Sequence, residues 1–354
     1  MAETIADDTT ETASSIPVDV DWAFAASVGR RIARPGPRVT RYTMEQARAE
    51  LTDAAVRAEG PVREVTGLAD GLRVPAARVV DRAGWIDAAS TSMPAMVSDS
   101  DEPATGVGAK LAGLQAGGLL AFLSSAILGQ YDPFTVDAET GEPGVLLLVA
   151  PNIIAVERQL RAAPADFRLW VCLHEVTHRV QFSANPWISG YMRDTVGSLA
   201  GGDEDSMTEM LARVTEALRS GKPREKGMIG VMQLLQSPEQ YAAFERMLAL
   251  GTLLEGHADH VMDAVGPAHV PSVEQIRAGF DARRTAARNP LQRLFRALIG
   301  MDAKMAQYVR GKAFVDEVVD TVGMERFNTI WTSPDTLPLM SEIDEPSTWI
   351  DRVL

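Results

Sequence analysis

Apolar residues recur every three or four positions over most of the chain, which is the spacing of amphipathic helices. Between residues 18 and 129 this pattern predicts helices in DWAFAASVGRRIA, in TMEQARAELTDAAVRA after a cap at Thr43, and in VPAARVVDRAGWIDAAS. Helical spacing resumes beyond residue 151, with breaks at pairs such as Gly266-Pro267. The sequence therefore predicts a mainly α fold.

One segment has a different pattern. The apolar run Val145–Val149 lies between Gly144 and Pro151 and predicts a buried strand, whereas the stretch before it, QYDPFTVDAETGEPG, is rich in turn-forming residues. We expect only a small β element around this strand. If the strand lies along a cleft, its free edge is placed to pair with an extended peptide.

The most apolar helical segment is Leu111–Gly129, which is nearly long enough to cross a bilayer. Gly113 and Gly117 have the small-residue spacing of closely packed helices. Gln115, the serines near the end of the segment and the lack of a second such span favour a buried central helix. We therefore expect no membrane partner.

The charge balance excludes one class of partner. Lys and Arg number 34 against 48 Asp and Glu, so the formal net charge is −14, and an acidic surface repels the phosphate backbone of nucleic acids. Hydrophobic residues make up 46% of the chain, which predicts a folded protein. The length of 354 residues predicts about two domains.

The N-terminal segment and the single cysteine indicate where in the cell the protein is expected. Residues 1–17 are acidic and rich in hydroxyl groups, which predicts a disordered acidic tail and not a secretory signal. Cys172 is the only cysteine, which excludes an intramolecular disulfide and a Cys-rich metal site. We expect a cytoplasmic protein, and the sequence makes no prediction of its oligomeric state.

The Arg-rich stretch 277–300 is interpreted as a solvated helix face that pairs with acidic surroundings.

The strongest chemical signal is HEVTH, residues 174–178, in the apolar segment FRLWVCLHEVTHRVQF. The pattern HExxH arises by chance in roughly 0.5% of shuffled chains of this composition. On a helix, His174 and His178 point to one side and can hold a metal ion. Glu175 lies one step around the helix, where it can act as general base on a water.

A third protein ligand is needed for a catalytic zinc site. The compact pattern HExxHxxGxxH fails, because residues 181 and 184 are Gln and Ala. Two further histidines cluster in LEGHADHVMD, residues 254–263. We expect Glu255 as the third ligand and Asp259 as an acceptor for an imidazole N–H, with His257 as the alternative ligand, because His257 points about 200° away from Glu255 on a regular helix.

HEVTHRVQF and LEGHADHVMD, with YDPF at 131–134 and SPDTLPLMSEIDEPSTWI near the C-terminus, resemble the bacterial zincin-like metallopeptidase family, in which a later Glu joins the HExxH pair on zinc (the gluzincin type). Some members carry a label of association with deazaflavin-coenzyme biosynthesis. The resemblance implies a zincin-like core with a small β element in residues 136–354, a helical N-terminal lobe in 18–135, and a Zn²⁺ cofactor. Two features depart from the pattern: a long helical insertion across 187–238, and a single predicted strand where zincins have a sheet.

The expected reaction is hydrolysis of a peptide bond in a peptide or protein substrate by a zinc-activated water, with Glu175 moving the proton. Candidates for the donor that stabilises the oxyanion in the transition state are His257, His260, Tyr191 and Arg193. Two alternatives stay open. One is a zinc-binding scaffold that acts as an interaction protein, against which the intact Glu175 counts. The other is a metallohydrolase for a small amide, which a closed pocket would favour.

Overall fold

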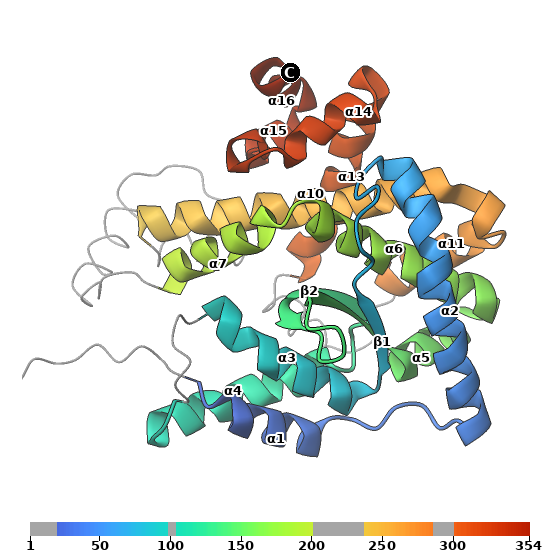
Figure 1. The fold of residues 1–354 in the computed structure, drawn as a ribbon, viewed down its shortest axis with the longest axis vertical. Helices are drawn as coiled ribbons and strands as arrows, with labels where there is room; N and C mark the ends of the chain where they lie inside the picture. The colour runs from blue at the N-terminus through green and yellow to red at the C-terminus, as the bar shows by residue number, and fades with distance from the viewer. Residues whose placement is uncertain (1–19, 98–103, 201–236, 286–300) are drawn as a thin grey trace, which may run out of the picture.

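Helices make up most of the structure and surround one small sheet (Figure 1). The computed structural model describes residues 20–97, 104–200, 237–285 and 301–354. The mainly α prediction is confirmed. The predicted acidic tail, most of the predicted insertion and the end of the Arg-rich stretch lie outside the described residues. The longer helices are α1 Trp22–Ile32, α2 Arg41–Thr66, α3 Arg82–Val97, α4 Val107–Leu123, α5 Ala150–Leu160, α6 Pro164–Ala184, α7 Trp187–Ala200, α10 Pro238–His269, α11 Val273–Thr285 and α13 Met301–Val322, and the short ones near the C-terminus are α14 Met324–Phe327, α15 Met340–Asp344 and α16 Pro346–Val353.

The sheet has three strands in the order β1-β3-β2, with β1 Ala76–Val80 parallel and β2 Gly129–Val136 antiparallel to β3 Pro143–Val149. β3 confirms the predicted strand. It is the central strand, however, and pairs on both sides, so the expectation that its edge is free for a peptide is wrong. An edge position in this sheet belongs instead to β2.

The other two strands were predicted as something else. β1 falls in a segment expected to be helical, and β2 in one expected to be turns. In β1, Val79 and Val80 are β-branched and pair with the apolar β3, so tertiary pairing outweighs helical spacing. β2 contains a turn-like irregularity, because the buried Asp132 carboxylate accepts hydrogen bonds from the backbone N–H groups of Phe134 and Thr135.

Alternate side chains of β3 enter two different cores, which explains its continuous apolar run. Leu146 and Leu148 pack with residues of α2, α5 and α6. Val145, Leu147 and Val149 pack with Trp85 and Ile86 of α3 on the opposite side. Helix α6 and helix α3 therefore cover opposite faces of the sheet.

Helix α4 corrects the prediction of a wholly buried central helix. It ends at Leu123, and one face is buried where Gly113 and Gly117 let it approach the α1 backbone closely: a Cβ on Gly117 would lie 2.6 Å from the Ala25 carbonyl oxygen. Leu111, Leu114 and other apolar side chains on the opposite face are exposed. Within the described part of the chain, no helix combines the length and the apolar character that a membrane span requires.

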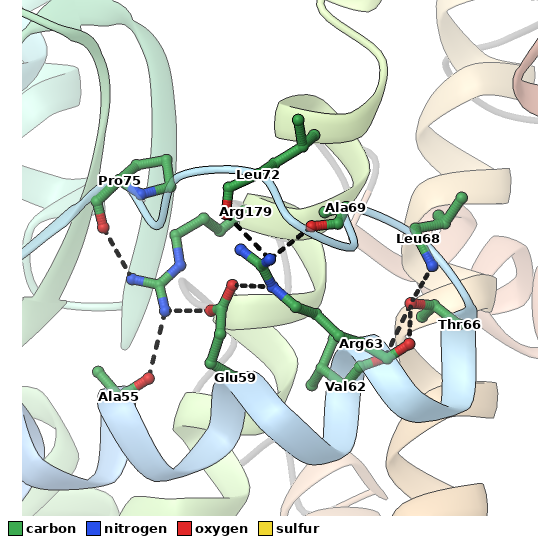
Figure 2. Close-up of polar contacts among 10 residues, drawn as sticks. All are labelled: Ala55, Glu59, Val62, Arg63, Thr66, Leu68, Ala69, Leu72, Pro75 and Arg179. Carbon is green, nitrogen blue, oxygen red and sulfur yellow. Dashed lines mark hydrogen bonds and ion pairs between the residues drawn. The ribbon is translucent and has the colours of Figure 1, made fainter.

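Helix α2 begins earlier than predicted, because Thr40 and not Thr43 is its N-cap: the Thr40 hydroxyl accepts a hydrogen bond from the Thr43 backbone N–H. The helix then runs beside α6. Figure 2 shows the polar contacts that join them.

A buried guanidinium holds α6 in place (Figure 2). Arg179, which is 2% exposed at its side chain, donates to the Pro75 carbonyl at 3.0 Å and to the Ala55 carbonyl at 3.2 Å, and it pairs with Glu59 of α2. Arg63 pairs with the same carboxylate at 2.7 Å. Breaking a buried pair of this kind costs about 3–5 kcal/mol. Because Arg179 directly follows His178, the network fixes α6 next to that histidine.

Helix α10 crosses α13 at two glycines. A Cβ on Gly256 would lie 2.2 Å from the Gly311 carbonyl carbon, and a Cβ on Gly311 would lie 2.2 Å from the Thr252 carbonyl oxygen. Real side chains do not approach backbone so closely, so the crossing requires glycine at both positions. Since Glu255 precedes Gly256, this contact also positions Glu255.

Gly256→Ala should destabilise the protein by about 2–3 kcal/mol, because the new methyl group forces two helix backbones apart. The measurement is urea unfolding of both proteins. The control is Gly251→Ala in the same helix, where a Cβ would meet nothing within 4 Å. That variant should be unchanged or stabilised by up to about 1 kcal/mol. Equal stability of the two variants would contradict the close crossing.

Candidate metal centre

Helix α6 brings two imidazoles together. His174 and His178 are one turn apart, and their Nε2 atoms lie 3.2 Å from each other. Both side chains are partly buried, at 22% and 15% exposure. The rest of α6 is largely buried and apolar, so the pair lies at the edge of the core and not on an open helix face.

Helix α10 adds a carboxylate from far along the chain. Glu255 Oε2 lies 3.4 Å from His174 Nε2 and 3.8 Å from His178 Nε2. Among the described residues, these three form the one group of His, Cys, Asp or Glu side chains whose ligand atoms all lie within 4.8 Å of one another. We call His174, His178 and Glu255 the cluster.

The spacing of the cluster fits zinc. Nitrogen and oxygen ligands at about 2.0–2.2 Å from a tetrahedral ion lie about 3.3–3.6 Å apart. The three separations in the cluster are 3.2, 3.4 and 3.8 Å. Two imidazoles and one carboxylate leave a fourth position for water, which is the ligand set of a catalytic zinc site.

The cluster holds a proton in the absence of a metal. Burial lowers the pKa of His174, but the hydrogen bond to Glu255 and the charges of Glu255, Glu175 and Asp259 outweigh burial and raise that pKa to about 9. His174 is therefore positively charged at neutral pH and pairs with Glu255.

Glu175 lies beside the cluster. Its carboxylate is buried against β2, where a Cβ on Gly129 would lie 2.6 Å from Glu175 Cγ, so only glycine leaves room for it. Burial raises the pKa of Glu175 to about 7; the His174 charge lowers it and the Glu255 charge raises it further. A carboxylate with this pKa can both accept and return a proton near neutral pH.

His257, the alternative ligand, lies outside the cluster. It is fully buried, stacks on Phe327 with ring centroids 5.6 Å apart, and contacts Trp331 edge-on at 5.3 Å. Burial, and the nearby charges of His260 and His178, lower the pKa of His257 to about 3, so the ring is neutral.

The remaining sequence candidates lie around the cluster or away from it. Asp259 contributes to the raised pKa of His174 and lies 4.0 Å from Arg277. His260 points to α13, where its Nδ1 lies 2.7 Å from Asp316 Oδ1. Tyr191 packs against Trp187 at the start of α7, and Arg193 donates to the Ala95 carbonyl and lies over the Phe134 ring. The contacts described for His260, Tyr191 and Arg193 are with residues outside the cluster, so these contacts assign none of the three as the oxyanion donor.

Sequence reasoning missed Gln181. Its side chain is fully buried, and its Oε1 lies 2.9 Å from His178 Nδ1. The available signal was its position three residues after His178, which puts both side chains on the same side of α6.

Comparison with known proteins gives two matches over nearly the whole chain. A family model described as zincin-like metallopeptidase matches residues 20–350. A crystal structure from Chloroflexus aurantiacus, provisionally described as a hydrolase with a novel fold, is similar with a TM-score of 0.65 and 30% sequence identity, over 94% of this chain and 98% of that chain. A search of curated proteins found no significant match.

Zinc binding should release about one proton at pH 7, because the metal displaces the proton that His174 holds below pH 9. The apparent zinc affinity should then rise about tenfold per pH unit between pH 6 and pH 8. Calorimetry in buffers of different ionisation enthalpy measures both effects. His269→Ala, at an exposed histidine, should leave the slope unchanged. An affinity that is independent of pH would contradict the charged state of His174.

Proposed function

Because the chain belongs to the zincin-like metallopeptidase family, as its motifs indicated, we propose that it is a zinc-dependent hydrolase that cleaves peptide bonds. The observation that carries the proposal is the approach of Glu255 to the two imidazoles of HEVTH, with a buried Glu175 beside them. The family and the similar structure support a hydrolase, and the ligand set of the cluster supports zinc.

In this proposal, His174, His178 and Glu255 hold the ion. When bound, Zn²⁺ supplies a Lewis acid that lowers the pKa of a water molecule and polarises the substrate carbonyl. Glu175 takes the proton from the attacking water at its carboxylate and gives it to the leaving amine. Gly129 leaves the space against β2 that the Glu175 carboxylate occupies.

In this proposal, an extended peptide substrate binds along the edge of the sheet. β2 is an edge strand, and its first residue, Gly129, touches the general base. An extended peptide that adds to this edge gains backbone hydrogen bonds and passes beside Glu175. This arrangement favours a peptide over a small amide, since a small metabolite gains nothing from a strand edge.

Glu175→Gln should abolish cleavage while zinc is retained, because the amide keeps the size of the side chain but cannot accept the proton. We expect a loss of about 10²–10⁴-fold in kcat/KM. The measurement is digestion of a peptide library, with metal analysis of the same protein samples. The matched control, Glu255→Gln, should lose both cleavage and zinc.

Two results would count against the proposal. Equal cleavage by the wild type and Glu175→Gln would remove Glu175 from the mechanism. Zinc retained by the wild type without any cleavage would favour the alternative of a zinc-binding interaction protein.

A further inference from the structure

A fully buried amide lies between the two helices that form the cluster. Gln181 Oε1 is 2.9 Å from His178 Nδ1, and Gln181 Nε2 is 3.0 Å from the Leu254 carbonyl oxygen and 2.9 Å from His257 Nδ1. Gln181 and His257 are both 0% exposed. The Gln181 amide and the His257 ring are therefore withdrawn from water, and their hydrogen bonding has to be complementary.

The contacts determine the direction of the amide. The Leu254 carbonyl can only accept, so the Gln181 NH₂ group faces it and the Gln181 oxygen faces His178. It follows that His178 donates from Nδ1. The Nε2 atom of His178 then carries the lone pair, and this is the atom that faces His174 and Glu255.

The second N–H of the amide is also used. It donates to His257 Nδ1, on a ring that Phe327 and Trp331 hold in place. Both N–H bonds and the carbonyl of Gln181 are thus engaged, so rotation of the amide would break three hydrogen bonds.

We propose that Gln181 is a positioning residue: it selects the tautomer and the orientation of His178 that bind the metal, and it ties helix α6 to the α10 segment that carries Glu255. The inference rests on the proposed function, because it concerns the same zinc site. Leu254 directly precedes Glu255. The Gln181 side chain therefore orients His178 on its own helix, α6, and also contacts the α10 backbone next to Glu255. In this interpretation His257 completes the hydrogen bonding of Gln181 and is not a ligand.

The test compares Gln181→Met with His257→Phe, in full-length protein, using zinc alone as the probe. Gln181→Met keeps the length of the side chain but removes the acceptor for His178. Its zinc affinity, measured by competition with a chromogenic chelator, should fall about 10–100-fold, the usual effect of losing a group that orients a ligand. His257→Phe removes one hydrogen bond to the same amide and leaves the His178 contact, so it should bind zinc within about threefold of the wild type.

A second readout separates positioning from general loss of structure. In metal-free protein labelled with ¹⁵N-histidine, the wild type and His257→Phe should show His178 protonated at Nδ1, and Gln181→Met should show a mixture of tautomers. Gln181→Glu keeps an oxygen facing His178 and should bind zinc more tightly than Gln181→Met.

Zinc binding by Gln181→Met within about threefold of the wild type would overturn the inference. An equal loss of affinity in His257→Phe would also overturn it, since the effect would then come from the disturbed core. If the wild type itself binds no zinc, the proposed function fails, and the inference fails with it.

Discussion

The site depends on how closely helix α10 approaches its neighbours. Glu255 meets the two histidines only because Gly256, the next residue, allows the α10 backbone to lie against α13 at Gly311. On the other side, Leu254 is bonded through its carbonyl to Gln181 of α6. Three consecutive residues therefore perform three tasks: Leu254 contacts the helix that carries the histidines, Glu255 approaches the two imidazoles, and Gly256 packs closely on α13. A shift of α10 by one residue would rotate the carboxylate about 100° away from the cluster.

Burial shifts the pKa values of two neighbouring groups in opposite directions, because it disfavours the charged form of each: it raises the pKa of Glu175 and lowers that of His174. The Glu255 carboxylate raises both pKa values, so it reverses the effect of burial at His174 and adds to it at Glu175. A positive imidazole therefore pairs with Glu255 while the adjacent carboxylate has a pKa near neutrality. In this state, a proton on His174 balances the charge of Glu255, so two helices with converging polar groups can pack together before any metal binds. The same proton then competes with the ion for the site.

Much of the site could be predicted from residue types and helix geometry. The HEVTH pair and Glu175 follow from spacing on one helix, and Glu255 from the clustering of ligand-type residues in 254–263. Less could be predicted where the outcome depended on contacts distant in sequence. β1 looked helical because its partner β3 lies some seventy residues on, as in the pairing of Ala76 with Val145, and β2 looked like turns because Asp132 and Pro133 do form one inside the strand. Gln181 was noted only as the residue that stands where the compact pattern has glycine, since its partners on α10 are invisible in the sequence.

Residues 181 and 184 together explain why the cluster draws on two helices. In the pattern HExxHxxGxxH, a glycine at this position and a histidine three residues later let one stretch of chain supply all three ligands. Here the position holds a buried amide that orients His178, and residue 184 is Ala, so the third ligand has to come from elsewhere. A metal held between α6 and α10 stabilises the packing of these helices as well as the site, because an ion that binds only the folded form adds its binding free energy to the stability of that form. The Gly256 crossing and the Gln181 bonds act in the same direction, since each holds α10 against a neighbouring helix beside Glu255.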